Sequence, residues 1–137
     1  MNQKIEPPNR PVVLLIEDNF MNRDMLVRRL ERRNFNVLEA EDGLQGLQFA
    51  RQKRPDIILL DINLPKMDGY DVARHLKSDP ETAIIPIIAL TAHALSKDRD
   101  KALAAGCDGY ATKPVDFAAL LYLIRSLLDV PEGGQTA

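Results

Sequence analysis

Residues 56–60 read DIILL, an apolar run that begins with an aspartate and is followed directly by a second one, Asp61. Continuous apolar runs containing β-branched residues are typical of strands covered on both faces, as in a parallel sheet. Residues 12–16 (VVLLI) and 84–90 (IIPIIAL) have the same character, and weaker runs span 36–40 and 109–111. The sequence therefore predicts five strands in a largely buried sheet.

Stretches with helical periodicity separate these runs. The clearest is the last, because Phe117, Leu120, Leu121, Ile124 and Leu128 form one apolar stripe. The others are expected over about residues 19–33, 44–53, the stretch after 69, and 95–105. Alternating strands and helices predict an α/β fold, a doubly wound five-stranded parallel sheet with five helices. In such sheets the functional crevice lies beyond the carboxyl ends of the strands.

The composition is that of an ordinary globular domain. The 137 residues are 45% hydrophobic and carry 18 Lys+Arg against 20 Asp+Glu. We expect a flexible lead-in over residues 1–10, one domain over 11–129 and a flexible tail over 130–137. The mixed charges disfavour nucleic-acid binding, and no apolar run approaches the roughly 20 residues of a membrane span. The single Cys107 excludes an internal disulfide and is expected to be a small buried filler, in a cytoplasmic protein.

Polar residues follow the strands that would border the crevice. Glu17 and Asp18 come after the first strand, Asp61 after the third, Thr91 after the fourth and Lys113 after the fifth. Three converging carboxylates repel one another unless a cation neutralises them. Mg²⁺ takes oxygen ligands and is typically held by one or two carboxylates together with a phosphate. The acidic cluster therefore predicts Mg²⁺ and a phosphorylated partner.

Asp61 is the expected nucleophile of this cluster, because aspartate carboxylates form acyl phosphates. Phosphoryl transfer needs positioning and charge neutralisation more than covalent help from the protein. Lys113 would supply positive charge, and Thr91 would donate one hydrogen bond. We thus predict catalytic roles for Asp61, Lys113 and Thr91.

Four segments carry these residues: 14–19 (LLIEDN), 60–69 (LDINLPKMDG), 90–92 (LTA) and 112–114 (TKP). Together they resemble the receiver domains of response regulators, such as the chemotaxis regulator and other single-domain regulators. The resemblance implies a flavodoxin-like sheet in the order 2-1-3-4-5. It also implies phosphorylation of Asp61 by a histidine kinase or histidine phosphotransfer protein, with self-catalysed phosphotransfer and autodephosphorylation as the only activities.

The resemblance further implies a metal site. Asp18 and Asp61 would bind Mg²⁺ through their side chains, Asn63 through its backbone carbonyl, and Glu17 through a metal-bound water. Many receiver domains carry Asp where this chain has Glu17, and the extra methylene could shift the affinity for Mg²⁺. The bond between Lys113 and the following proline would be cis.

A switch is implied as well. The hydroxyl of Thr91 would move toward the phosphoryl group, and the ring of Tyr110 would turn into the space released. Asn63 and His93 occupy the positions that tune dephosphorylation in this family. Asn22 and Arg23 after the acidic pair resemble the receivers of hybrid kinases and phosphorelay regulators.

We expect a stand-alone two-component regulator whose output passes through an unknown downstream protein. The receiver domain of a hybrid kinase, acting as a phosphorelay intermediate, is the alternative. A hydrolase of the haloacid dehalogenase type needs an acid two residues after the nucleophile, where this chain has Asn63. A dinucleotide enzyme needs a Gly-x-Gly-x-x-Gly motif after the first strand, which is absent. A degenerate scaffold would not need the complete set of polar residues.

Overall fold

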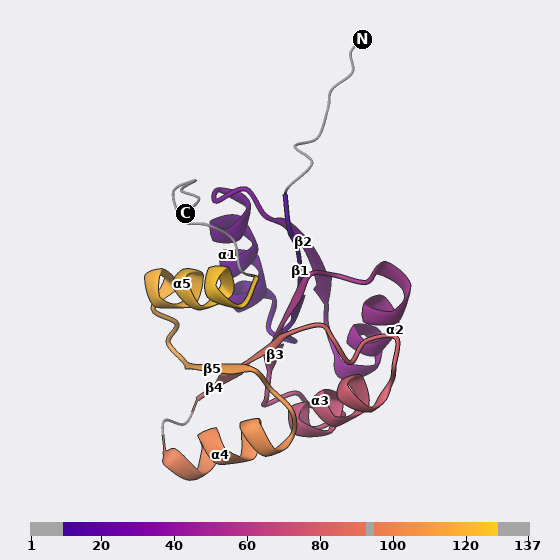
Figure 1. Cartoon of the computed structure of the whole chain (residues 1–137). Coiled ribbons are helices and arrows are strands. Elements are labelled where there is room, and N and C mark those ends of the chain that lie inside the picture. Colours follow the sequence, from indigo (N-terminus) through magenta and orange to yellow (C-terminus); the bar gives the residue numbers. More distant parts are fainter. Residues whose placement is uncertain (1–9, 93–94, 129–137) are drawn as a thin grey trace.

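Five strands alternate with five helices along the chain (Figure 1). The structure, a computed structural model, describes residues 10–92 and 95–128. The strands are β1 (Val12–Ile16), β2 (Asn36–Ala40), β3 (Ile57–Asp61), β4 (Ile87–Thr91) and β5 (Gly109–Thr112). The helices are α1 (Phe20–Glu31), α2 (Gly43–Lys53), α3 (Gly69–Ser78), α4 (Ser96–Ala104) and α5 (Phe117–Leu128). None of these helices combines the length and apolar character needed to cross a bilayer.

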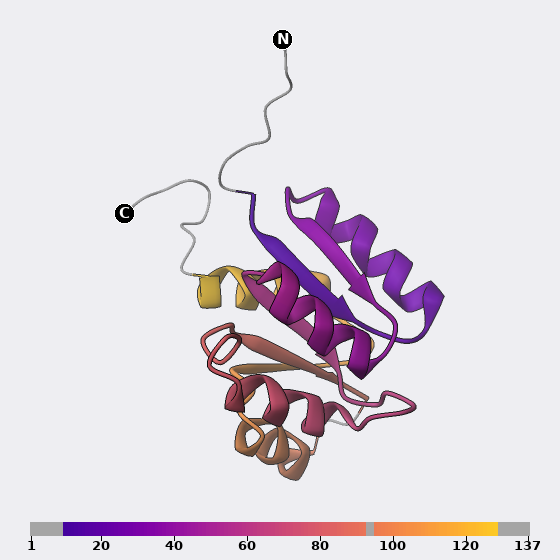
Figure 2. The same ribbon diagram turned by 90° about the vertical axis from the view of Figure 1, so that its right-hand side faces the viewer.

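The strands form one parallel sheet in the order β2-β1-β3-β4-β5, which confirms the predicted topology. Helices α1 and α5 cover one face, and α2, α3 and α4 cover the other (Figure 1). Figure 2 has α2 and α3 in front of the strands. Leu14 and Ile58 belong to the core beneath α2, α3 and α4, whereas Leu15 and Leu59 belong to the core beneath α1 and α5. The continuous apolar runs therefore fill two cores, because alternate residues point to opposite faces.

The limits of three strands, β3, β4 and β5, differ from the sequence prediction. Strand β4 begins at Ile87 rather than Ile84, which is 81% exposed. Pro86 has no N–H for the sheet, although its carbonyl accepts from the Ile58 N–H at 2.9 Å. Asp61 and Thr91 are the last residues of their strands rather than the first residues beyond them. Both side chains consequently start from rigid, fully buried strands.

The connection from β1 to α1 is only three residues long and contains the acidic pair. Asn19 caps α1, because its Oδ1 accepts the Asn22 N–H at 2.9 Å. At the other end of the connection, the Glu17 N–H donates to the Ala40 carbonyl at 3.0 Å. The short, capped connection leaves the backbone of Glu17 and Asp18 little freedom to move.

Candidate functional site

Three carboxylates meet at the carboxyl edge of the sheet. One carboxylate oxygen from each of Glu17, Asp18 and Asp61 lies within 4.8 Å of the others. Glu17 and Asp61 are buried, at 3% and 2% exposure, whereas Asp18 is exposed. The sheet order explains this meeting, because β1 and β3 are neighbours and end at the same edge.

Lys113 enters this cluster from the loop after β5. Its Nζ lies 3.2 Å from Glu17 Oε1 and 3.3 Å from Asp61 Oδ2. The Lys113 N–H also donates to the Thr91 carbonyl at 2.8 Å, which ties the start of this loop to the end of β4. The Lys113–Pro114 peptide bond is cis, as the resemblance implies.

The charges of the cluster do not cancel. Burial raises the pKa of the Glu17 carboxyl and the Asp61 carboxylate adds to the rise, although the Asn19 N–H and Lys113 oppose it. Burial lowers the pKa of Lys113, but Asp61 and Glu17 together raise it above its ordinary value. Lys113 therefore stays charged near neutral pH. One ammonium facing three carboxyl groups leaves the site short of positive charge.

The loop from β3 to α3 fixes the second oxygen of Asp61. The Asn63 N–H donates to Asp61 Oδ1 at 3.0 Å. Further along, the Gly69 N–H donates to the Ile62 carbonyl at 3.1 Å and closes the loop. A Cβ on Gly69 would lie 2.5 Å from the Cα of Ile62, so the close approach requires glycine. Each Asp61 oxygen thus has a defined partner, Asn63 on one side and Lys113 on the other.

Thr91 and Tyr110 lie on adjacent strands beside this cluster. Thr91 is 2% exposed and lines a cavity of about 810 Å³ together with Asn63 and the first residues of α4. Tyr110 is half-buried and packs against the core beneath α2, α3 and α4. The predicted tuning residue His93 lies outside the described residues.

The donor set fits a hard divalent cation. Glu17, Asp18 and Asp61 offer only oxygen atoms, and oxygen ligands suit Mg²⁺ rather than softer metals. Their separation of at most 4.8 Å lets a single ion reach one oxygen of each. A cation there would also offset the excess negative charge.

Arg23 is a buried residue of this region, for which the sequence predicts only a resemblance to hybrid-kinase and phosphorelay receivers. Its side chain is 8% exposed, and its Nη1 donates to the Glu17 carbonyl at 2.8 Å. The signal was present in the sequence, because Arg23 shares the spacing i, i+4, i+7 with the buried Val27 and Leu30 of α1. An arginine at an apolar helix position suggests a buried partner.

This chain matches a known protein family over most of its length. The model of the response regulator receiver domain family matches residues 13–125. The chain belongs to this family. The polar-differentiation response regulator DivK of Brucella anthropi is 36% identical to this receiver domain over 116 residues, which cover 85% of the chain and 94% of DivK.

Solved structures agree with this assignment. The receiver domain of sensor histidine kinase PA1611 from Pseudomonas aeruginosa is 35% identical, with a TM-score of 0.81 over 88% of this chain and 98% of that one. That structure has a magnesium ion coordinated in its active site cleft. Chemotaxis response regulator CheY4 of Vibrio cholerae is 26% identical, with a TM-score of 0.82 over 87% of this chain and 99% of that one. The protein is thus a receiver domain of two-component signalling.

Proposed function

We propose that this receiver domain is phosphorylated on Asp61 by a histidine kinase or a histidine phosphotransfer protein, and that phosphorylation changes its binding to a downstream protein. The observation that carries the proposal is the meeting of Glu17, Asp18 and Asp61 within 4.8 Å, with Lys113 between Glu17 and Asp61. Phosphoryl transfer requires a positioned nucleophile and positive charge close to it. This site has a buried carboxylate beside an ammonium, and its excess of negative charge favours a further cation.

The transfer proceeds in one displacement at phosphorus. A carboxylate oxygen of Asp61 attacks the phosphorus of a phosphohistidine while the phosphorus–nitrogen bond breaks. The imidazole nitrogen keeps the electron pair and takes a proton, and Asp61 is left as an acyl phosphate. Water later attacks this phosphorus, which restores the carboxylate and releases inorganic phosphate. The protein contributes positioning and charge rather than turnover of a substrate.

Lys113 serves this step through its position. Its ammonium lies 3.3 Å from Asp61 Oδ2, so it can pair with an oxygen of a phosphoryl group attached there. The Asn63 N–H holds Asp61 Oδ1 and limits rotation of the carboxylate. These two contacts keep the nucleophile aligned as the donor approaches.

Asp18, Asp61 and the Asn63 backbone carbonyl would hold Mg²⁺ directly, and Glu17 would hold it through water. When bound, the ion would supply positive charge to the phosphoryl oxygens. The oxygen-only donor set supports this assignment, and so does the magnesium ion in the related PA1611 receiver domain.

Thr91 and Tyr110 would report the phosphorylated state. The buried Thr91 ends β4 at the same edge as Asp61, and the cavity beside it leaves room for the hydroxyl to move. Tyr110, half-buried on β5, could then turn inward and alter the surface that a partner contacts. We expect the protein to act in the cytoplasm, with neither nucleic acid nor membrane among its partners.

A second role is favoured by one comparison. The PA1611 receiver domain, 35% identical, belongs to a sensor histidine kinase. The same site could therefore pass its phosphoryl group onward as a phosphorelay intermediate of a hybrid kinase. Transfer from phosphorylated Asp61 to a histidine phosphotransfer protein, measured with a radiolabelled phosphoryl group, would separate this role from a terminal switch.

Intact mass spectrometry tests the proposal. We expect the mass of one phosphoryl group to be added when the protein is incubated with Mg²⁺ and acetyl phosphate, and hydroxylamine to remove it. Asp61→Asn should gain nothing, and EDTA should suppress the gain in the wild type. Absence of any adduct at saturating donor would favour a scaffold, and steady turnover of phosphatase substrates would favour a hydrolase.

A further inference from the structure

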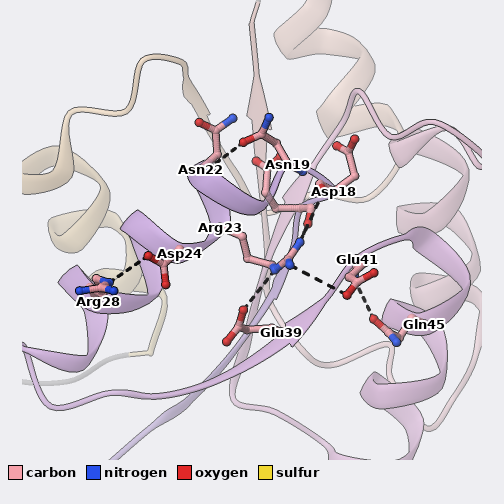
Figure 3. Close-up of polar contacts among 10 residues, drawn as sticks. Asp18, Asn19, Asn22, Arg23, Asp24, Arg28, Glu39, Glu41 and Gln45 are labelled. Atoms are coloured by element: carbon pink, nitrogen blue, oxygen red, sulfur yellow. Dashed lines mark hydrogen bonds and ion pairs between the residues drawn. The ribbon is translucent and has the colours of Figure 1, made fainter.

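The guanidinium of Arg23 points toward the backbone beside Asp18 and toward Glu39 and Glu41 (Figure 3). Arg23 belongs to the first turn of α1, and its guanidinium contacts two other segments of the chain. Nη1 donates to the Glu17 carbonyl at 2.8 Å and approaches the Asp18 carbonyl at 3.5 Å. Nε donates to Glu39 Oε1 at 3.1 Å, and Nη2 lies 4.0 Å from Glu41 Oε2. The residue thus joins the β1–α1 connection to the end of β2.

The contacts of Arg23 with acidic side chains do not explain its burial. The side chains of Glu39 and Glu41 are 45% and 70% exposed, so water screens both ion pairs. Ion pairs of this kind contribute about 1 kcal/mol or less to stability. The hydrogen bond to the Glu17 carbonyl, by contrast, is buried. The strongest contact of Arg23 is therefore the one that reaches the acidic pair.

The direction of the Glu17 carbonyl governs the direction of the side chains beside it. Fixing this carbonyl fixes the peptide plane between Glu17 and Asp18, which joins the two Cα atoms that carry the carboxylates. The Glu17 N–H is already held by the Ala40 carbonyl at 3.0 Å, and the Asn19 N–H donates to Glu17 Oε2 at 3.1 Å. Arg23 completes this set by holding the carbonyl between them.

We propose that Arg23 is a positioning residue of the acidic cluster, which holds the backbone of Glu17 and Asp18 in the arrangement that binds a divalent cation. This inference rests on the proposed function, because it takes Mg²⁺ as the ligand of the cluster. Groups that orient metal ligands commonly change metal affinity by ten- to a hundredfold when they are removed. Arg23 acts from the backbone side of the ligands and would not touch the ion.

Two substitutions separate positioning from general support of the fold. Arg23→Lys keeps the positive charge, but a lysine ammonium lacks the planar fork that serves the carbonyl and Glu39 together. Glu39→Gln removes the screened ion pair and leaves the guanidinium on the Glu17 carbonyl. Circular dichroism would establish that each variant is folded. If Arg23→Lys does not fold, Arg23→Gln would be measured in its place.

Isothermal titration calorimetry with Mg²⁺ gives the deciding measurement. We expect the dissociation constant to rise about tenfold or more in Arg23→Lys, and to stay within about twofold of the wild type in Glu39→Gln. Phosphorylation by acetyl phosphate should slow in Arg23→Lys at limiting Mg²⁺ and recover at saturating Mg²⁺. A purely structural role would lower thermal stability without producing this dependence on Mg²⁺.

Hydrogen exchange on the metal-free protein gives an independent measurement. In EDTA, the amide protons of Glu17 and Asn19 should exchange faster in Arg23→Lys than in the wild type or Glu39→Gln. Wild-type affinity for Mg²⁺ in Arg23→Lys, or an equal loss in Glu39→Gln, would overturn the inference and leave the proposed function intact. Failure of the wild-type protein to bind Mg²⁺ at all would instead contradict both the inference about Arg23 and the proposed function.

Discussion

The ammonium of Lys113 lies 3.2 Å from Glu17 Oε1, although 96 residues separate the two in the chain. Glu17 follows β1, and Lys113 follows β5 at the far side of the sheet. The same ammonium lies 3.3 Å from Asp61, at the end of the strand next to β1. Lys113 therefore links the edge strand β5 to the acidic cluster near the middle of the sheet.

Replacing Lys113 should separate metal binding from phosphorylation. In Lys113→Met the carboxylates of Glu17 and Asp61 lose their nearest cation, so we expect Mg²⁺ to bind a few-fold more tightly in calorimetry. Phosphorylation by acetyl phosphate should nonetheless slow by about tenfold or more, because the phosphoryl oxygens lose a positive partner. Lys53→Met, at the exposed end of α2, is the matched control and should change neither. Weaker Mg²⁺ binding in Lys113→Met would contradict this account.

Gly69 should be intolerant of a side chain. A Cβ there would lie 2.5 Å from the Cα of Ile62 and 2.8 Å from the Asp61 carbonyl oxygen, and neither backbone atom can move cheaply. We expect Gly69→Ala to lose about 1–3 kcal/mol of unfolding free energy in urea denaturation and to phosphorylate more slowly. Gly109→Ala is the control, because its Cβ would meet the flexible Leu123 side chain at 3.1 Å. Equal stability of the two variants would argue against the tight loop.

Thr91 should be dispensable for the final yield of phosphorylated protein, though not for the consequence of phosphorylation. Thr91→Ala leaves Asp61 and Lys113 in place, so we expect intact mass spectrometry to show a yield of phosphorylated protein close to that of the wild type. With the hydroxyl removed, the Tyr110 ring should no longer change environment on phosphorylation. Fluorine NMR of fluorotyrosine-labelled protein would detect this, with the Tyr110 signal assigned by Tyr110→Phe.

Thr91→Ser is the control for this experiment, because it keeps the hydroxyl. Its Tyr110 signal should shift on phosphorylation as in the wild type. A full shift in Thr91→Ala would remove Thr91 from the switch.

Cys107 should be inert in the folded protein. The thiol is 5% exposed, and burial, with a smaller contribution from Asp108, raises its pKa to about 11. Since the thiolate is the reactive form, alkylation by iodoacetamide near neutral pH should be slower than in urea by about a hundredfold. The raised pKa also means that any stability contributed by the neutral thiol is lost as the pH rises toward 11. Rapid alkylation without denaturant would show that the thiol is accessible.

The sequence predicts the centre of the sheet well because β1, β3 and β4 are buried on both faces. Continuous apolar runs such as residues 12–16 leave few alternatives to a central parallel strand. The predicted start of β4 at Ile84 is wrong, because Ile84 continues an apolar run but lies in a turn before Pro86. Apolar composition alone does not distinguish a turn residue from a strand residue.

The candidate site could be listed from the sequence, but its internal contacts could not. Glu17 and Asp61 lie at the ends of neighbouring strands, so both reach the carboxyl edge of the sheet whatever the orientation of their side chains. The contact of Arg23 with the Glu17 carbonyl depends on how α1 turns after a three-residue connection. The sequence assigns Arg23 only a resemblance to the receivers of hybrid kinases and phosphorelay regulators, and its place on the apolar face of α1 is the one signal of burial.

The central claim is that Asp61, and no other acid of the cluster, accepts the phosphoryl group. Borohydride reduces an acyl phosphate to an alcohol, so phosphorylated Asp61 would become homoserine, which tandem mass spectrometry can locate. After treatment with acetyl phosphate and Mg²⁺, we expect homoserine at position 61, and EDTA should abolish it. Homoserine at position 18 instead, or none at all despite saturating donor, would contradict it.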